Sequence, residues 1–131
     1  MGSGAILTEV IQAAELLSAQ HIEVSVYSVT SWSELARDGA ACELARLNNA
    51  RNQDVPFLYQ QLSKSHGPII AATDYVRAVP ESTRAYLPAE RRFMTLGTDG
   101  FGRSDTRAAL RSFFGVDAKT IVRAALLALK S

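Results

Sequence analysis

The sequence predicts an α/β domain in which a mainly parallel β-sheet is covered by helices on both faces. Three observations lead to this prediction. Short apolar runs rich in β-branched residues alternate along the chain with amphipathic helical patterns. The 131 residues suit a single domain, predicted to span 1–131, with a core that needs no disulfide or metal. Finally, with 47% hydrophobic and 21% charged residues, the chain is too apolar for a disordered protein.

The chain opens with a pattern typical of a helix followed by a strand. Apolar side chains from Ile6 to Leu17 recur at spacings of four, four and three residues, which places them on one helix face. In the next segment, 22–29, β-branched apolar residues alternate with polar or smaller ones. That period of two predicts a strand with one buried face.

A capping box marks the next helix. Ser31-Trp-Ser-Glu34 has the Ser-x-x-Glu form, so the helix should begin near Trp32 and run to about Leu47, with Gly39 as a candidate break. Pro56 then suits the first turn of a further short helix, because its missing N–H costs nothing there.

The second half repeats the order of strand and helix. Residues 69–73 and 93–96 are short apolar runs of the kind found in buried parallel strands, and a weak helix between them should reach about Tyr86. A helix over 105–114 should be capped by Ser104 or Asp105 and end at Gly115. Asp117 should cap the last helix. Its predicted buried face consists of Ile121, Val122, Ala125, Leu126 and Leu129.

Composition excludes several classes of protein. The net charge of +1 is divided between a slightly acidic first half and a slightly basic second half, without the basic stripe of a nucleic-acid-binding protein. No apolar run is long enough to span a membrane and no secretory signal precedes the domain, so a cytoplasmic location is expected. The single Cys42 cannot form an internal disulfide, and no residue cluster has the spacing of a metal site.

Candidate site residues lie where the predicted strands end, because ligands and partners of parallel sheets bind outside the carboxyl ends of the strands. The most unusual stretch is the loop 97–104, Gly-Thr-Asp-Gly-Phe-Gly-Arg-Ser, whose glycines permit close approach by another surface. The candidates for a partner interface or an anion site are Asp74, Tyr75, Asp99, Gly100, Phe101, Gly102, Arg103, Ser104 and Arg107. The alternative is a tight strand-to-helix connection whose polar groups cap the helix.

The basic residues after this loop leave two interpretations open. Arg103, Arg107 and Arg111 follow one another at four-residue spacing and share one side of the predicted helix. They could meet a phosphate or carboxylates of a neighbouring domain, or they could form a solvated basic face. Because the glycine spacing differs from that of a dinucleotide site, the loop gives little support to nucleotide binding.

No residues form a recognisable catalytic signature. His21 and His66 lie at predicted element boundaries, and Cys42 lies among small residues as an inert thiol would. Asp74 and Asp99 could converge as an acid/base pair, but helix capping and ion pairing are the simpler roles. We therefore assign no catalytic, cofactor-binding or metal-binding residue.

Three stretches carry a resemblance to a known family. They are Tyr-Ser-Val-Thr-Ser-Trp-Ser-Glu-Leu-Ala-Arg-Asp-Gly at 27–39, Ala-Ala-Thr-Asp-Tyr at 71–75 and Leu-Gly-Thr-Asp-Gly-Phe-Gly-Arg-Ser-Asp-Thr-Arg at 96–107. Together they resemble the C-terminal domain of the homodimeric bacterial pyruvate dehydrogenases. The similarity extends from Gly2 nearly to Lys130, which would make the chain a fragment of a larger enzyme.

The resemblance implies a transketolase C-terminal-like fold, with three α/β/α layers and a mostly parallel sheet. It also implies a parent enzyme that uses thiamine diphosphate and Mg²⁺ to decarboxylate pyruvate and reductively acetylate lipoyl groups. In that family the preceding domains hold the cofactor and metal, so no catalytic residue transfers to this sequence. The implied partners are the other domains of the parent chain, the second subunit of a homodimer and the dihydrolipoyl acetyltransferase complex.

The sequence departs from the family at its start. The resemblance implies a central strand immediately before Gly2-Ser3-Gly4, and this strand is largely missing. Either the flanking segments 22–28 and 69–73 close up directly, or another chain supplies pairing, and we hypothesise self-association through the exposed edge. The alternative function is a regulatory module that binds a small molecule or an anion at the start of the helix predicted over 105–114.

Overall fold

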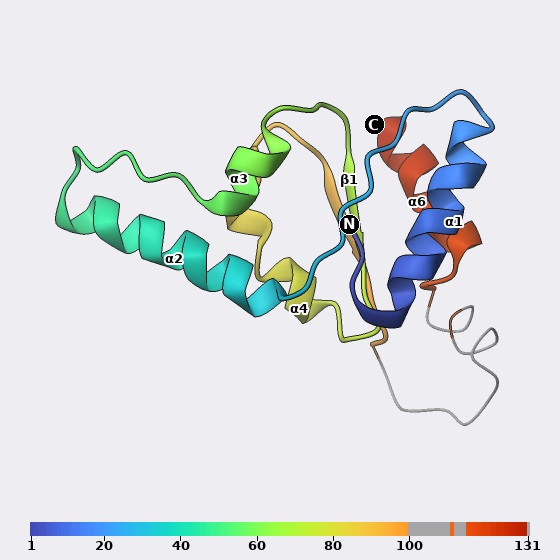
Figure 1. Cartoon of the computed structure of the whole chain (residues 1–131), viewed down its shortest axis with the longest axis horizontal. Coiled ribbons are helices and arrows are strands. Elements are labelled where there is room, and N and C mark those ends of the chain that lie inside the picture. The colour runs from blue at the N-terminus through green and yellow to red at the C-terminus, as the bar shows by residue number, and fades with distance from the viewer. Residues whose placement is uncertain (100–110, 112–114, 131) are drawn as a thin grey trace.

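A computed structural model describes residues 1–99, 111 and 115–130 of the chain (Figure 1). The helices are α1 (Leu7–Ser18), α2 (Trp32–Asn48), α3 (Phe57–Leu62), α4 (Ala78–Glu81) and α6 (Ala118–Leu129), with 3₁₀ turns η1 (Gly4–Ile6) and η2 (Arg84–Tyr86). The strands are β1 (Ile69–Ala72) and β2 (Phe93–Leu96). Among these described residues no helix has the length and apolar character needed to cross a membrane.

The two strands form a parallel sheet to which the start of the chain is added. β1 and β2 pair from Ile69 opposite Phe93 to Ala72 opposite Leu96. On the other side of β1, Gly2 forms parallel bridges with both Ala72 and Ser28. Residues 1–3 therefore lie between β1 and the segment that ends at Ser28, as a very short central strand.

The strand predicted over 22–29 is wrong in its extent, because only Ser28 takes part in a described bridge. Residues 1–3 separate this segment from β1, so the two flanking segments do not close up directly. The segment that ends at Ser28 pairs with residues 1–3 through Tyr27 and Val29, and a strand needs such a neighbour for its N–H and C=O groups. Residues 23–26 have the apolar alternation of a strand but make no backbone hydrogen bond within the described part of the chain.

Helices cover the sheet on both faces, as predicted, and two apolar clusters result (Figure 1). On one face Trp32, Leu58 and Leu62 pack with Ile69, Ala71 and Phe93. On the other, α1 and α6 pack against each other and against Ala72 through Val10, Ala13 and Ile121. Alternate residues of β1 thus belong to opposite clusters, which is the period of two expected of a buried strand.

The predicted helix boundaries are mostly confirmed. Ser31 caps α2, its Oγ accepting a hydrogen bond from the Glu34 N–H at 3.2 Å, and Asp117 caps α6 through the Thr120 N–H, also at 3.2 Å. Gly39 does not break α2. A Cβ there would lie 2.3 Å from the Tyr86 ring, so this glycine permits close packing of η2 on the helix.

Two further predictions, both about helices, differ from the structure, and a third cannot be compared with it. The weak helix before Tyr86 is two short turns, α4 and η2. Leu129 is exposed, although the periodicity of α6 places it on the buried face. The helix predicted over 105–114 lies outside the described residues, apart from Arg111.

Candidate functional site

Buried side chains from three segments tie the carboxyl end of the sheet together. The Trp32 Nε1–H donates to Ser3 Oγ at 2.9 Å, and the Ser3 hydroxyl donates to Thr73 Oγ1 at 2.9 Å. Thr73 Oγ1 also accepts the Tyr75 N–H at 3.2 Å. The relay joins the start of α2, the short strand 1–3 and the end of β1, and it fixes where the following loop begins.

Hydrogen bonds from the loop after β2 to backbone groups of the loop after β1 join the two loops. The Thr98 N–H donates to the Tyr75 carbonyl at 2.9 Å, and the Thr98 hydroxyl donates to the Asp74 carbonyl at 2.6 Å. One residue further, Asp99 Oδ1 accepts the N–H of Arg77 at 2.7 Å. These hydrogen bonds hold residues 74–77 and 97–99 together, and we call these two short stretches the rim.

Gly97 is required for this close approach. A Cβ at this position would lie 2.7 Å from the Tyr75 carbonyl oxygen and 2.8 Å from the Arg77 nitrogen. Both contacts involve backbone atoms, which cannot rotate away as a side chain could. Gly97 therefore has a packing role, and its conformational freedom is not needed to explain it.

Within the described residues, the rim presents two neighbouring exposed apolar side chains and no cluster of reactive groups. Tyr75 and Val76 are 59% and 49% exposed, side by side in the chain. The two predicted carboxylates have different partners, since Asp99 caps Arg77 while the carboxylate of Asp74 lies against Gly4 at the start of η1. Their arrangement favours the capping role over an acid/base pair.

Part of the predicted site cannot be compared with the structure. Gly100, Phe101, Gly102, Arg103, Ser104 and Arg107 lie outside the described residues. Arg111 is described, and it is engaged within the domain. Its Nη1 donates to Glu9 of α1 at 3.1 Å, with both side chains mostly buried. Arg111 therefore belongs neither to a solvated basic face nor to an open phosphate site.

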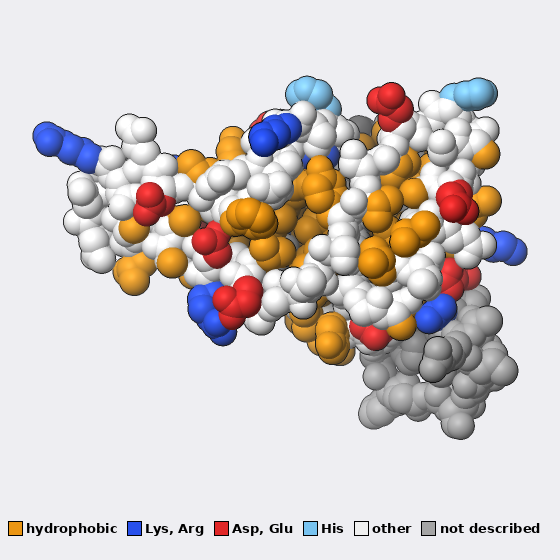
Figure 2. Space-filling view, in the orientation of Figure 1, with side chains coloured by type: hydrophobic (Ala, Val, Ile, Leu, Met, Phe, Trp, Pro, Cys, Tyr) orange, Lys and Arg blue, Asp and Glu red, His pale blue; other side chains and the backbone are white. Residues whose placement is uncertain are grey.

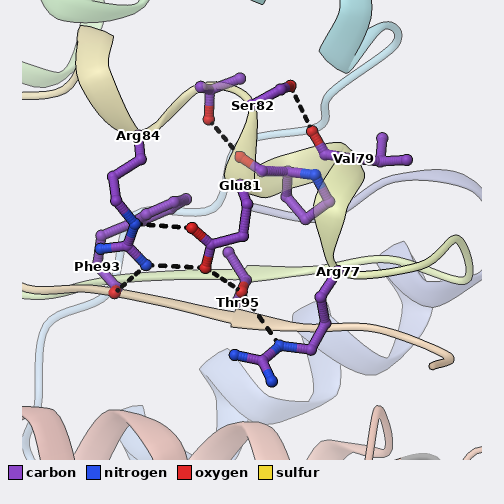
Figure 3. Close-up of polar contacts among 9 residues, drawn as sticks. Arg77, Val79, Glu81, Ser82, Arg84, Phe93 and Thr95 are labelled. Atoms are coloured by element: carbon purple, nitrogen blue, oxygen red, sulfur yellow. Dashed lines mark hydrogen bonds and ion pairs between the residues drawn. The ribbon is translucent and has the colours of Figure 1, made fainter.

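A polar cluster on the outer edge of β2 was not predicted from the sequence (Figure 3). Arg84 donates to both carboxylate oxygens of Glu81, at 2.7 and 2.8 Å, and to the Phe93 carbonyl at 3.2 Å. The Thr95 hydroxyl donates to Glu81 at 2.6 Å and accepts from Arg77 Nε at 3.4 Å. The Glu-x-x-Arg spacing is the signal that could have predicted the ion pair.

This cluster protects the sheet and is not suited to proton transfer. The hydrogen bonds from Arg84, with smaller help from Thr95 and from the charge of Arg77, lower the pKa of Glu81 to about 2. A carboxylate that stays ionised at neutral pH cannot act as a general acid. By occupying the Phe93 carbonyl, which points away from β1, Arg84 also makes the edge strand less able to pair with another strand.

The described residues contain no group of three or more His, Cys, Asp or Glu side chains placed to hold a metal ion. Nor do they leave a buried side-chain nitrogen or oxygen without a hydrogen-bond partner that a ligand would have to satisfy.

Comparison with known proteins identifies the family. Residues 1–117 match the family model of the transketolase-like TK C-terminal domain. The chain belongs to this family. The resemblance inferred from the three sequence stretches is thereby confirmed, and so is the predicted α/β fold of transketolase C-terminal type.

Relatives of this transketolase C-terminal-like domain occur in much longer proteins. The chain is 44% identical to the pyruvate dehydrogenase E1 component of Mycobacterium tuberculosis, and the match covers 98% of the chain but 14% of the relative. For the E1 component of Escherichia coli K12, the figures are 46%, 96% and 14%. The Pseudomonas aeruginosa E1 component is 45% identical over 98% of the chain and 15% of its own length. The domain is thus homologous to about one-seventh of each relative.

A solved structure gives the same fold. The protein described as a split gene transketolase, inactive beta4 tetramer, superposes with a TM-score of 0.62. The match covers 98% of this chain and 38% of that one, at 21% sequence identity. At this identity the comparison supports the architecture alone.

Proposed function

We propose that the chain is the C-terminal assembly domain of a thiamine-diphosphate-dependent pyruvate dehydrogenase, and that it supplies docking surface while the chemistry takes place elsewhere in the enzyme. The parent enzyme would decarboxylate pyruvate and reductively acetylate lipoyl groups in the bacterial cytoplasm. Its E1-component relatives support the parent activity. The observation that carries the assembly role is the rim of Tyr75 and Val76, which is exposed, apolar and rigidly held.

A rim of this kind suits an interface. Exposed apolar side chains on a rigid support lose little conformational freedom on binding, and aromatic residues often contribute most of the binding energy at interfaces. The partner we propose for this rim is the second subunit of a homodimer or a neighbouring domain of the parent chain. The dihydrolipoyl acetyltransferase complex is the further partner of the assembled enzyme.

The cofactor belongs to the rest of the parent enzyme in this proposal. Thiamine diphosphate would supply a carbanion-stabilising centre, and Mg²⁺ would hold its diphosphate. The described residues do not fit this pair, since they contain no cluster of carboxylate, His or Cys ligands. No step of the reaction is therefore assigned to a side chain of this domain.

The test uses the full-length enzyme that contains this domain. Replacing both rim residues, Tyr75→Ser and Val76→Ser, should raise the dimer dissociation constant about tenfold or more, as loss of an interface anchor does. Turnover per assembled dimer should stay unchanged. Sedimentation equilibrium measures the dissociation constant, and a pyruvate-dependent dye-reduction assay measures turnover.

A matched control comes from another exposed apolar pair, Leu44 and Leu47 on α2, which lies away from the rim. The Leu44→Ser and Leu47→Ser variant should leave the rim interface intact. Unchanged assembly with reduced turnover in the rim variant would refute the proposal. Substitution of Phe101 or Arg103 is also predicted to raise the dimer dissociation constant.

A further inference from the structure

The rim carries groups of both charges beside its exposed apolar side chains. Tyr75 and Val76 are exposed, and Arg77, which follows them in the chain, is exposed as well. Asp99, also exposed, lies on the loop after β2 and is hydrogen-bonded to the backbone of Arg77. Hydrophobic side chains reach the lower margin of the molecule in Figure 2, where Figure 1 places the loop between β1 and α4. The rim thus combines an apolar pair with a cation and an anion.

The guanidinium group of Arg77 is held in place but is not neutralised by a partner. Its Nε donates to the Thr95 hydroxyl at 3.4 Å, and its terminal nitrogens point away from Glu81 (Figure 3). Both oxygens of the Glu81 carboxylate are already bound, by Arg84 and Thr95. Among the described residues Arg77 forms no ion pair, and its terminal nitrogens make no hydrogen bond. This leaves a planar pair of donors that matches the geometry of a carboxylate.

The carboxylate of Asp99 is only partly used. Its Oδ1 accepts the Arg77 N–H at 2.7 Å, whereas its Oδ2 makes no hydrogen bond within the described part of the chain. The two side chains do not pair with each other, because the guanidinium of Arg77 extends along β2 towards Thr95. As far as the described residues show, the rim therefore presents an unpaired guanidinium and an unpaired carboxylate oxygen at neighbouring positions.

A surface of this composition complements a copy of itself. In a two-fold symmetric interface the same patch lies on both subunits, so that one residue contacts a second residue of the partner and the reverse contact is made as well. An acidic partner would bring a like charge against Asp99, and a basic partner would bring one against Arg77, and like charges that face each other across an interface are unfavourable. A second copy pairs both charges at once, and its apolar side chains can pack on Tyr75 and Val76.

We propose that the rim binds the same rim of a second copy of this domain, with the guanidinium of Arg77 in each copy paired with the carboxylate of Asp99 in the other. Tyr75 and Val76 supply the apolar part of the contact. This contact rests on the assembly role proposed above and specifies the partner of that surface. Because the contact is symmetric, one substitution in the chain removes two ion pairs from the dimer.

The test exchanges charges in the full-length enzyme that contains this domain. Arg77→Asp and Asp99→Arg each place like charges across the interface, so each variant alone should raise the dimer dissociation constant about a hundredfold or more. In an equal mixture of the two variants, one rim carries two carboxylates and the other carries two guanidinium groups. The mixture should therefore form a heterodimer with a dissociation constant within about tenfold of the original, because both ion pairs are restored. Sedimentation velocity with one variant fluorescently labelled measures it.

Asp99→Asn separates the charge from the fold. It keeps a side-chain oxygen that can accept the Arg77 N–H, and it should raise the dissociation constant about tenfold because two ion pairs are lost. Added salt should weaken the original dimer more than the Asp99→Asn dimer, since only the original has this charge pair to screen. Arg46→Asp, an exposed charge reversal in the last turn of α2, is the matched control and should leave the dimer unchanged.

The outcomes distinguish this contact from the assembly role on which it rests. If the Tyr75→Ser and Val76→Ser variant weakens the dimer but mixing Arg77→Asp with Asp99→Arg restores nothing and Asp99→Asn dimerises like the original, the symmetric contact is overturned and the assembly role stands. If none of these substitutions changes the dissociation constant, both proposals fail. A heterodimer in the mixture, with Arg46→Asp unaffected, supports the symmetric contact.

Discussion

At the carboxyl end of the sheet, side chains and backbone groups from several segments tie the strand ends together, whereas at the amino end the same segments part around a groove. The Trp32–Ser3–Thr73 relay and the Thr98 hydrogen bonds close the first region. In the second, residues 23–26 have no described backbone partner. The difference shows that the hydrogen bonds between segments distant in sequence are concentrated at the carboxyl end of this sheet.

The two ends of the sheet also present different kinds of surface. The carboxyl end presents preformed side chains on a fixed backbone, which suits recognition of a folded partner. The amino end presents a groove whose wall is largely apolar, between the segment 22–27 and β1. Variants that change one end of the sheet and leave the other unchanged test whether the two ends are independent.

The largest effect is expected at the relay. Trp32 is 2% exposed, and Trp32→Ala should lower the free energy of unfolding by about 3–5 kcal/mol, because it leaves a cavity and removes the indole donor to Ser3. Urea denaturation followed by far-UV circular dichroism measures the change. Tyr75→Ala, at the exposed rim, should change stability by about 0.5 kcal/mol or less. Similar losses in both variants would mean that the relay is not what closes this end.

Gly97→Ala should have the next largest effect. The added methyl group would meet the Tyr75 carbonyl and the Arg77 nitrogen, and displacing these backbone atoms should cost about 1–3 kcal/mol. Thermal unfolding measures the loss. An alanine variant as stable as the original chain would contradict the close crossing of the two loops.

The third prediction concerns the amino end. The Arg91 guanidinium donates to the carbonyls of Leu62, His66 and Gly67, and it therefore holds the connection between α3 and β1 beside the groove. Arg91→Met keeps much of the aliphatic length but removes these bonds, which should cost about 1–2 kcal/mol. Arg91→Lys should recover part of the loss. Hydrogen exchange should quicken around residues 62–67 and stay unchanged at Ala72, and a uniform change would contradict a local role.

The smallest effect depends on pH. The folded-state pKa of Glu81 is lowered to about 2 from an ordinary value of 4.5, chiefly by Arg84. Its contribution to stability is therefore present above pH 4.5 and is lost as the pH falls towards 2. With side-chain exposures of 31% for Glu81 and 51% for Arg84, solvent screening limits this contribution to about 1 kcal/mol.

Urea unfolding of the original chain and of Glu81→Gln tests that pH dependence. The difference in unfolding free energy between the two proteins should be constant from pH 7 to pH 5 and should vanish near pH 2. A difference that does not change with pH would show that the carboxylate charge of Glu81 is not what stabilises this edge.

The sequence was sufficient to predict an element wherever a local pattern of residues determines it. The Ser31 and Asp117 caps, the apolar runs of β1 and β2 and the helix from Trp32 each follow from residues a few positions apart. The prediction of 22–29 as a strand failed because strand formation depends on a neighbour from elsewhere in the chain. Leu129 was misplaced for a related reason, since helical periodicity cannot indicate that the facing surface is an open groove.

The sequence predicted the position of three candidate residues but not their contacts, and their role in a partner interface stays a prediction. Asp74, Tyr75 and Asp99 do come to the carboxyl end of the sheet, as the rule for parallel strands indicates. The roles of their contacts depend on residues distant in sequence, such as Arg77 for Asp99 and Ser3 for Thr73. The ion pair of Arg111 with Glu9 joins residues about one hundred positions apart, so helix spacing alone could not predict it.

The central claim is that this domain contributes surface and not chemistry. Its most direct test is calorimetric titration of the 131-residue chain with thiamine diphosphate and Mg²⁺, combined with an assay of pyruvate consumption by the same sample. We predict no saturable heat and no turnover above the rate without protein. Stoichiometric cofactor binding accompanied by pyruvate decarboxylation would contradict the account.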